Sequence, residues 1–171
     1  LGSLEHPVGS LIFDSRQANS SSVFFAIKGS ATDGHLFVQQ AHDKGCRIFV
    51  VQNNIPDLSD STIIKTSDTS ALLASMSCNF FENPSKKLKL IGVTGTNGKT
   101  TCTSLLYKLF SGLGYKCGLI STVVNKIGST DIVATHTTPD PVSLNRLLAQ
   151  MVSENCTHCF MEVSSHAIHQ N

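Results

Sequence analysis

The chain has no long apolar run and almost no net charge. Its 171 residues include 13 basic and 12 acidic side chains, so the net charge is +1 and no strong field draws it to nucleic acid or to an anionic membrane. No apolar stretch approaches the roughly 18 residues that span a bilayer. The N-terminus Leu-Gly-Ser-Leu-Glu-His lacks the basic flank and apolar core of a signal peptide. Binding must therefore come from specific sites.

The composition is that of a globular chain with room for one ordinary domain or two small ones, since 40% of its residues are apolar. The six cysteines are scattered through helix-like and strand-like runs, which favours reduced thiols in the cytoplasm. Cys156-Thr157-His158-Cys159 has a spacing that zinc could use, but no second pair lies nearby. The chain lacks an initiating methionine, and we expect it to be a fragment of a longer protein.

The most informative segment is Gly95-Thr96-Asn97-Gly98-Lys99-Thr100-Thr101, a glycine-rich turn that ends in Gly-Lys-Thr. Such a loop can direct backbone N–H groups at a polyphosphate, with the lysine on the outer phosphates and the threonine hydroxyl on Mg²⁺. An apolar run over residues 88–93 precedes it and a helical pattern over residues 99–112 follows. The general pattern wants glycine where Val93 stands. The context still predicts a P-loop and a nucleotide-binding protein.

Two halves are expected on either side of the break Glu82-Asn83-Pro84-Ser85-Lys86-Lys87, which gives domains at residues 1–84 and 85–171. Periodicity predicts the elements of each half. In the first half these are strands at 10–13, 23–27, 47–52 and 62–65, with helices at 34–44 and 68–81. In the second they are strands at 88–93, 117–121 and 159–163, with helices at 99–112 and 141–154. The fold class is therefore α/β, with parallel strands and ligands at their carboxyl ends.

Three further segments could carry chemistry. Glu162 ends an apolar strand, where a P-loop protein places a second metal-directed carboxylate; it could also be only a surface glutamate. Thr137-Thr138-Pro139-Asp140 precedes a helix and offers hydroxyls to a ligand, although Thr138 or Asp140 could simply cap that helix. Asp14-Ser15-Arg16, taken alone, reads as a turn with a buried salt bridge.

Together, four motifs in the same order resemble those of the Mur ligases of peptidoglycan synthesis. They are the loop at 95–101, Thr-Thr-Pro at 137–139, Met161-Glu162-Val163-Ser164-Ser165-His166-Ala167, and Asp14-Ser15-Arg16. The resemblance spans nearly the whole chain. It implies a small N-terminal α/β domain that grips the UDP end of UDP-MurNAc-L-Ala-D-Glu, followed by the first part of a parallel-sheet ATPase domain. It also implies a third domain beyond residue 171 that receives the incoming diamino acid.

The resemblance also implies the roles of individual residues and an ATP-dependent ligase that forms an amide through an acyl phosphate. The diamino acid is expected to be meso-diaminopimelate, or otherwise L-lysine, and the whole enzyme a cytoplasmic monomer. Lys99 and Glu162 are the expected catalytic residues, and Thr100 and Glu162 the Mg²⁺ ligands. ATP is expected on Gly95, Thr96, Asn97, Gly98, Lys99, Thr100 and Thr101. The UDP substrate is expected on Ser15, Ser30, Ala31, Thr32, His136, Thr137, Thr138, Ser164 and Gln170.

Three other functions remain open from the residues. Asn125-Lys126-Ile127-Gly128 mimics the guanine-reading Asn-Lys-x-Asp of GTP-binding switches, but glycine replaces the aspartate that would pair with the base. A UDP-sugar-binding module without catalysis would keep the same pocket. A folylpolyglutamate synthetase would share the ATP loop, although a separate UDP-gripping domain argues against it.

Overall fold

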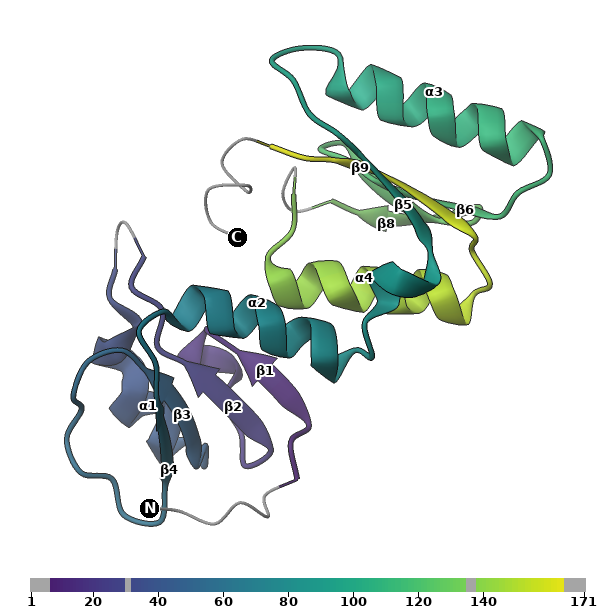
Figure 1. The fold of residues 1–171 in the computed structure, drawn as a ribbon. Helices are drawn as coiled ribbons and strands as arrows, with labels where there is room; N and C mark the ends of the chain where they lie inside the picture. The colour runs from purple at the N-terminus through teal and green to yellow at the C-terminus, as the bar shows by residue number, and fades with distance from the viewer. Residues whose placement is uncertain (1–6, 30–31, 135–137, 165–171) are drawn as a thin grey trace. The chain divides into compact units, whose positions relative to one another are not determined.

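The computed structural model describes residues 7–29, 32–134 and 138–164, which form two compact units, residues 1–75 and 76–171 (Figure 1). The division between the units falls within helix α2 (Thr69–Phe80), whereas the sequence places a domain boundary after residue 84. A 3-10 helix, η3 (Pro84–Lys87), follows α2 and starts at Pro84. The domain boundary at 84/85 stays a prediction. No helix among the described residues is long and apolar enough to cross a membrane.

The first unit is a parallel sheet in the order β1-β2-β3-β4. Its core combines strand side chains such as Phe24 and Phe49 with Val38 and Ala41 of helix α1. The elements before α2 are β1 (Ser10–Ile12), η1 (Ser15–Gln17), β2 (Ser22–Phe25), η2 (Gly34–Phe37), α1 (Val38–Asp43), β3 (Ile48–Val51) and β4 (Thr62–Lys65). The helix expected over residues 34–44 is thus a 3-10 turn that leads into a short α-helix.

The second unit contains a sheet in the order β5-β9-β6-β7-β8. Strand β9 runs parallel to both of its neighbours, β5 and β6. The elements are β5 (Lys89–Val93), α3 (Lys99–Gly112), β6 (Cys117–Ile120), β7 (Val124–Ile127), β8 (Thr130–Val133), α4 (Pro141–Ser153) and β9 (His158–Glu162).

Helices α3 and α4 cover opposite faces of this sheet (Figure 1). Leu119 and Phe160 pack against Leu106, Tyr107 and Phe110 of α3. On the other face, Ile120, Cys159 and Met161 pack with Leu148 and Met151 of α4. Because side chains alternate along a strand, this packing assigns each β9 residue to a face. Phe160 lies under α3, and Glu162, two residues later, lies on the same side.

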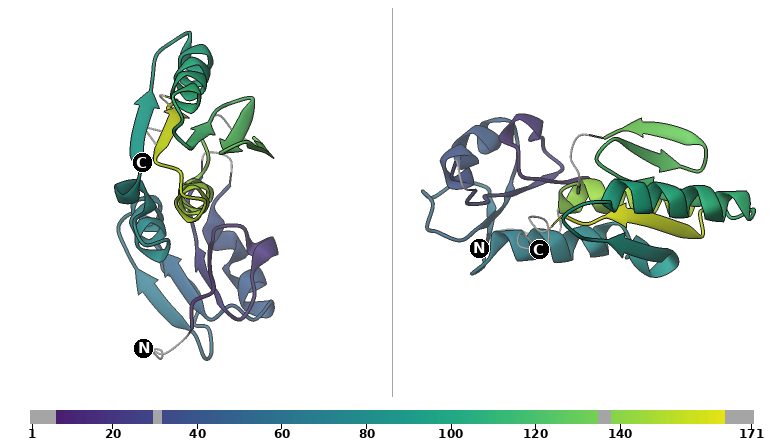
Figure 2. Two further views of the ribbon diagram at one scale, coloured as in Figure 1. Left: turned by 90° about the vertical axis from the view of Figure 1, so that its right-hand side faces the viewer. Right: turned by 90° about the horizontal axis from the view of Figure 1, so that it is seen from above.

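The hairpin β7–β8 was not expected from the sequence (Figure 2). The sequence predicts three strands in the second half, all parallel, but β6, β7 and β8 pair antiparallel. Each hairpin strand is only four residues long and mixes polar with apolar side chains, so its periodicity is weak. Gly128, with φ of 56°, begins the tight connection between the strands. The α/β class with parallel sheets is nevertheless confirmed.

Candidate functional site

The glycine-rich loop connects β5 to α3 at the carboxyl end of the sheet. Gly95 has φ of 148° and Gly98 φ of 81°, and Gly98 is the residue that caps the start of α3. The loop residues 94–98 are exposed. Lys99 Nζ donates to Gly95 O at 2.7 Å and to Thr96 O at 3.4 Å, so the ammonium lies over the loop. The site therefore has a positive charge and a helix N-terminus at one place, which suits a phosphate.

Glu162 lies beside this loop, because it pairs in register with Val93, the last residue of β5. It is 1% exposed, which excludes a surface glutamate. Its Oε1 accepts from the Thr122 backbone N–H at 3.0 Å, and its Oε2 accepts from Thr122 Oγ1 at 3.0 Å. The packing of Phe160 places Glu162 on the α3 side of the sheet, at the end where α3 begins. A buried carboxylate thus sits next to the phosphate loop.

Thr138 and Ser164, expected to contact the same substrate, do meet in the structure. The hydroxyl of Thr138 donates to Glu162 O at 3.1 Å and accepts from the backbone N–H of Ser164 at 3.2 Å. Thr138 does not cap the following helix. That role belongs to Asp140, whose Oδ1 accepts from the backbone N–H groups of Val142 and Ser143, each at 3.0 Å. These contacts bring the Thr-Pro segment to the carboxyl end of β9.

Ser15 lies just after β1, at the carboxyl end of the first sheet, and is 6% exposed. Its hydroxyl donates to Gln40 Oε1 at 2.6 Å, which fixes the turn to α1. In the neighbouring ion pair, 2.7 Å long, Arg16 is exposed and Asp14 partly buried, so the pair is not the buried salt bridge that the sequence suggested. The hydrogen bond from the Arg16 side chain, with one from its backbone N–H, lowers the pKa of Asp14.

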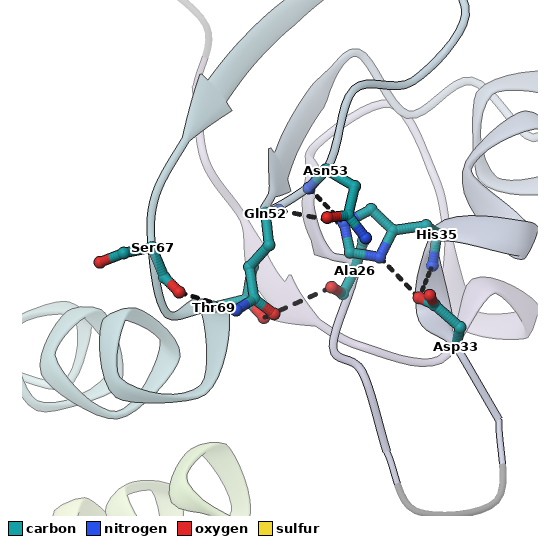
Figure 3. Close-up of polar contacts among 7 residues, drawn as sticks. All are labelled: Ala26, Asp33, His35, Gln52, Asn53, Ser67 and Thr69. Carbon is teal, nitrogen blue, oxygen red and sulfur yellow. Dashed lines mark hydrogen bonds and ion pairs between the residues drawn. The ribbon is translucent and has the colours of Figure 1, made fainter.

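A hydrogen-bond network at the same end of the first sheet begins at Asp33 (Figure 3), which follows Thr32 in the sequence. Asp33 Oδ1 accepts from the His35 backbone N–H at 2.9 Å and lies 2.6 Å from His35 Nδ1. His35 Nε2 accepts from the backbone N–H groups of Gln52 and Asn53, at 3.0 and 3.2 Å. An Nε2 atom that accepts these bonds leaves the ring hydrogen on Nδ1, facing Asp33. The network fastens the exposed segment of Thr32 to the end of β3.

Several expected substrate residues lie outside the described residues: Ser30, Ala31, His136, Thr137 and Gln170. The same holds for Ser165 and His166. Of the expected set, the structure thus places the whole phosphate loop, Glu162, Thr138 and Ser164 at the carboxyl end of the second sheet. Ser15 and Thr32 lie at the carboxyl end of the first.

The possible zinc motif is accounted for by packing. The His158 ring packs against the rings of Phe110 and Tyr115, with centroids 5.0 and 4.9 Å away. Burial raises the pKa of the Cys159 thiol to about 12, so it stays protonated. Within the described ranges, no three His, Cys, Asp or Glu side chains are grouped to hold a metal. All six cysteines are free thiols.

Asn125, which began the guanine-reading pattern, has a structural contact instead. It is buried in β7, and its side-chain oxygen accepts from the Ser121 backbone N–H at 3.2 Å. The residue that sequence reasoning missed is Thr122, which holds both carboxylate oxygens of Glu162. A Ser-Thr pair just after an apolar strand was a signal for a turn at this edge, but without the β6–β9 pairing nothing connected Thr122 to Glu162.

Comparisons with known proteins agree with the motifs. A model of the Mur ligase family catalytic domain matches residues 8–80, and a model of the Mur ligase middle domain matches residues 93–171. The chain is 51% identical over 168 residues to the UDP-N-acetylmuramoyl-L-alanyl-D-glutamate--2,6-diaminopimelate ligase of Cytophaga hutchinsonii, covering 97% of this chain and 35% of that protein. It is 45% identical over 172 residues to the ligase of the same name from Phocaeicola vulgatus, covering 99% of this chain and 35% of the relative.

Solved structures give the same result for the fold. A structure of a ligase of the same name superimposes with a TM-score of 0.81 at 25% identity, covering 96% of this chain and 33% of that one. MurF from Acinetobacter baumannii superimposes with a TM-score of 0.62 at 23% identity, covering 92% of this chain and 31% of that one, which bears on the fold alone. The chain spans about a third of the length of these relatives, 35% for the first two. With Mur ligase models matching both halves and close relatives along nearly its whole length, the chain belongs to the Mur ligase family.

Proposed function

We propose that this chain supplies the UDP-substrate domain and the first part of the ATP-binding domain of an amide ligase. The ligase adds meso-diaminopimelate to UDP-MurNAc-L-Ala-D-Glu in peptidoglycan precursor synthesis. The observation that carries the proposal is the buried Glu162 carboxylate in register with Val93, at the start of a Gly-Lys-Thr loop. The name shared by the relatives supports the choice of diamino acid, with L-lysine as the alternative.

Residues 1–84 form the proposed UDP-MurNAc-binding domain, with the turn of Ser15 and the segment of Ser30, Ala31 and Thr32 on the uridine part. Residues 85–171 form the proposed nucleotide half. There the loop from Gly95 to Thr101 holds ATP, and Thr138 and Ser164, with His136, Thr137 and Gln170, contact the diphosphate and muramoyl portion. The contact between Thr138 and Ser164 supports a shared surface for these two. We expect the enzyme to act as a monomer in the cytoplasm.

The proposed reaction follows from the low reactivity of a carboxylate toward amines. The γ-carboxylate of D-Glu attacks the terminal phosphorus of ATP, ADP leaves, and the amine then displaces inorganic phosphate from the acyl phosphate to form the amide. Lys99 stabilises negative charge on the transferred phosphoryl group. Its ammonium donates to two loop carbonyls, Gly95 O at 2.7 Å and Thr96 O at 3.4 Å, and has a third N–H for a phosphate oxygen. Most of the remaining assistance comes from holding the reactants in line.

The donor atoms present suit Mg²⁺. Thr100 offers a hydroxyl and Glu162 a carboxylate, both hard oxygen ligands on the side of the sheet that carries α3. Each Glu162 oxygen accepts one hydrogen bond from Thr122, so a lone pair on each remains for another partner. When bound, Mg²⁺ would neutralise charge on the phosphates of ATP.

The test is release of inorganic phosphate by the complete polypeptide with UDP-MurNAc-L-Ala-D-Glu, ATP and either meso-diaminopimelate or L-lysine. We expect release that depends on all three substrates and is faster with meso-diaminopimelate. Folate in place of the UDP substrate, and GTP in place of ATP, serve as controls that should give none. Turnover with folate, or strong preference for GTP, would contradict the ligase assignment. Binding of both substrates without turnover would favour a binding module.

A further inference from the structure

Among the residues that the structure describes, Thr122 supplies both of the hydrogen bonds that the buried carboxylate of Glu162 accepts. The backbone N–H of Thr122 reaches Oε1 and its hydroxyl reaches Oε2, each at 3.0 Å. A carboxylate held at both oxygens by one residue keeps one plane and one rotation about its terminal torsion, which is otherwise broad for glutamate. Glu162 therefore has a fixed direction, and Thr122 sets it.

Thr122 is itself held by a closed turn between β6 and β7. Ser121 Oγ donates to Val124 O at 2.6 Å, and the Val124 backbone N–H donates back to Ser121 Oγ at 3.2 Å. The buried Asn125 side chain accepts from the Ser121 backbone N–H at 3.2 Å. The turn is thus held by hydrogen bonds that do not involve Glu162.

Thr122 is nevertheless exposed, unlike the carboxylate that it holds. Its side chain fills no core space, so a merely structural role would be small at this position. The hydrogen bonds to Glu162 are what its hydroxyl and N–H contribute.

We propose that Thr122 is a positioning residue, which aims the Glu162 carboxylate at a divalent cation bound with the nucleotide phosphates. The inference rests on the proposed function, because it takes Glu162 and the loop at 95–101 as the metal and phosphate site. Residues that hydrogen-bond to a metal ligand fix its orientation, and their removal commonly weakens metal affinity about 10- to 100-fold. Because Thr122 is exposed to water, we expect an effect at the low end of that range.

The test uses three variants of the complete polypeptide. Thr122→Val keeps the shape and the backbone N–H but removes the hydroxyl, while Thr122→Ser keeps the hydroxyl. Thr130→Val is the matched control, since Thr130 is also an exposed threonine and lies on β8 of the same sheet. Binding of a fluorescent ATP analogue is measured in EDTA and across a Mg²⁺ titration, and far-UV circular dichroism checks that each variant is folded.

We expect Thr122→Val to need roughly tenfold more Mg²⁺ for the same nucleotide affinity, and to match the parent in EDTA. Thr122→Ser and Thr130→Val should both stay close to the parent. Equal losses with and without Mg²⁺, or an unchanged Mg²⁺ requirement in Thr122→Val, would overturn the inference. Failure of the parent to bind the nucleotide under any condition would instead overturn the proposed function, and this inference with it.

A double-mutant cycle separates action through Glu162 from action elsewhere. Glu162→Gln should itself raise the Mg²⁺ requirement, and adding Thr122→Val to it should raise that requirement no further, because the residue that Thr122 aims is already lost. If the two losses add in full, Thr122 acts by another route and the inference is wrong.

Discussion

Two glycines of the second unit, Gly98 and Gly112, have similar free space around them but different backbone conformations, so replacing each by alanine tests the effect of the backbone alone. A Cβ added at Gly98 or at Gly112 would meet nothing within 4 Å. Gly98, the cap of α3, has φ of 81°, whereas Gly112 is the last residue of α3 and has no positive φ. Alanine at either position therefore creates no clash, and any change in stability comes from backbone strain and conformational entropy.

The expected effects have opposite signs. An alanine forced into the left-handed region costs about 1–2 kcal/mol, so Gly98→Ala should lower the free energy of unfolding by roughly that amount. At Gly112 the helical conformation is one that alanine prefers. Gly112→Ala should therefore raise the free energy of unfolding by about 0.4–1 kcal/mol, mainly by restricting the unfolded chain.

The measurement is urea unfolding followed by far-UV circular dichroism, because the sequence has no tryptophan to serve as a fluorescence probe. The two variants are compared with the parent at one temperature, and the slopes of the transitions are checked for equality. If Gly98→Ala were as stable as the parent, or if both variants shifted in the same direction, φ at Gly98 would not be what makes glycine necessary there.

Three further predictions concern the site and the pH dependence. Lys99→Ala should abolish phosphate release and leave binding of the UDP substrate nearly intact; turnover that survives the change would refute the role of Lys99. Ser15→Ala removes the hydrogen bond to Gln40 Oε1 and should lower the affinity for the UDP substrate by about tenfold without changing the affinity for ATP. Equal losses of both affinities in calorimetry would contradict a uridine site in the first unit. Burial lowers the pKa of His158, so the fold favours its uncharged ring, and the free energy of unfolding should fall as pH drops below about 6.5. In His158→Phe this part of the loss should vanish. If the variant's free energy of unfolding depended on pH as the parent's does, His158 would not be the cause.

Most of the fold could be predicted because its helices and long apolar strands have strong local signals. The helix over residues 99–112 and the strand over residues 62–65 have the predicted bounds. Local pattern could not say which side of α3 faces the sheet, since Leu105 and Leu109 are 60% and 57% exposed while Leu106 and Phe110 pack inward. That choice depends on how β6 and β9 lie beneath the helix. The short strands β7 and β8 were missed for the same reason, because their pairing and not their sequence period defines them.

Some residues of the candidate site could likewise be predicted from the sequence and others could not. The loop at 95–101 was visible because its chemistry is contiguous in the sequence, and Glu162 because a strand ends there. Thr122 was not, because its partner Glu162 is far away in the sequence and is brought beside it only by the pairing of β6 with β9. The pattern at Asn125 mimicked a guanine-reading motif, which the glycine at 128 already argued against, and the structure adds that Asn125 is buried and accepts from the Ser121 backbone N–H. Sequence spacing finds motifs, whereas contacts between distant segments need the topology.

The position of β9 has a consequence for how the second unit is made. This strand is the last of the described sheet in the chain, yet it lies between β5 and β6. Until residues 158–162 leave the ribosome, β5 has no partner among the described strands. The nucleotide loop, which follows β5, is then not held in place by a paired strand. The first sheet, by contrast, pairs β1 to β4 among the described residues, and all four strands have been made by Lys65. During synthesis the two halves should therefore acquire structure in turn, with the sheet of the nucleotide half incomplete until β9 is made.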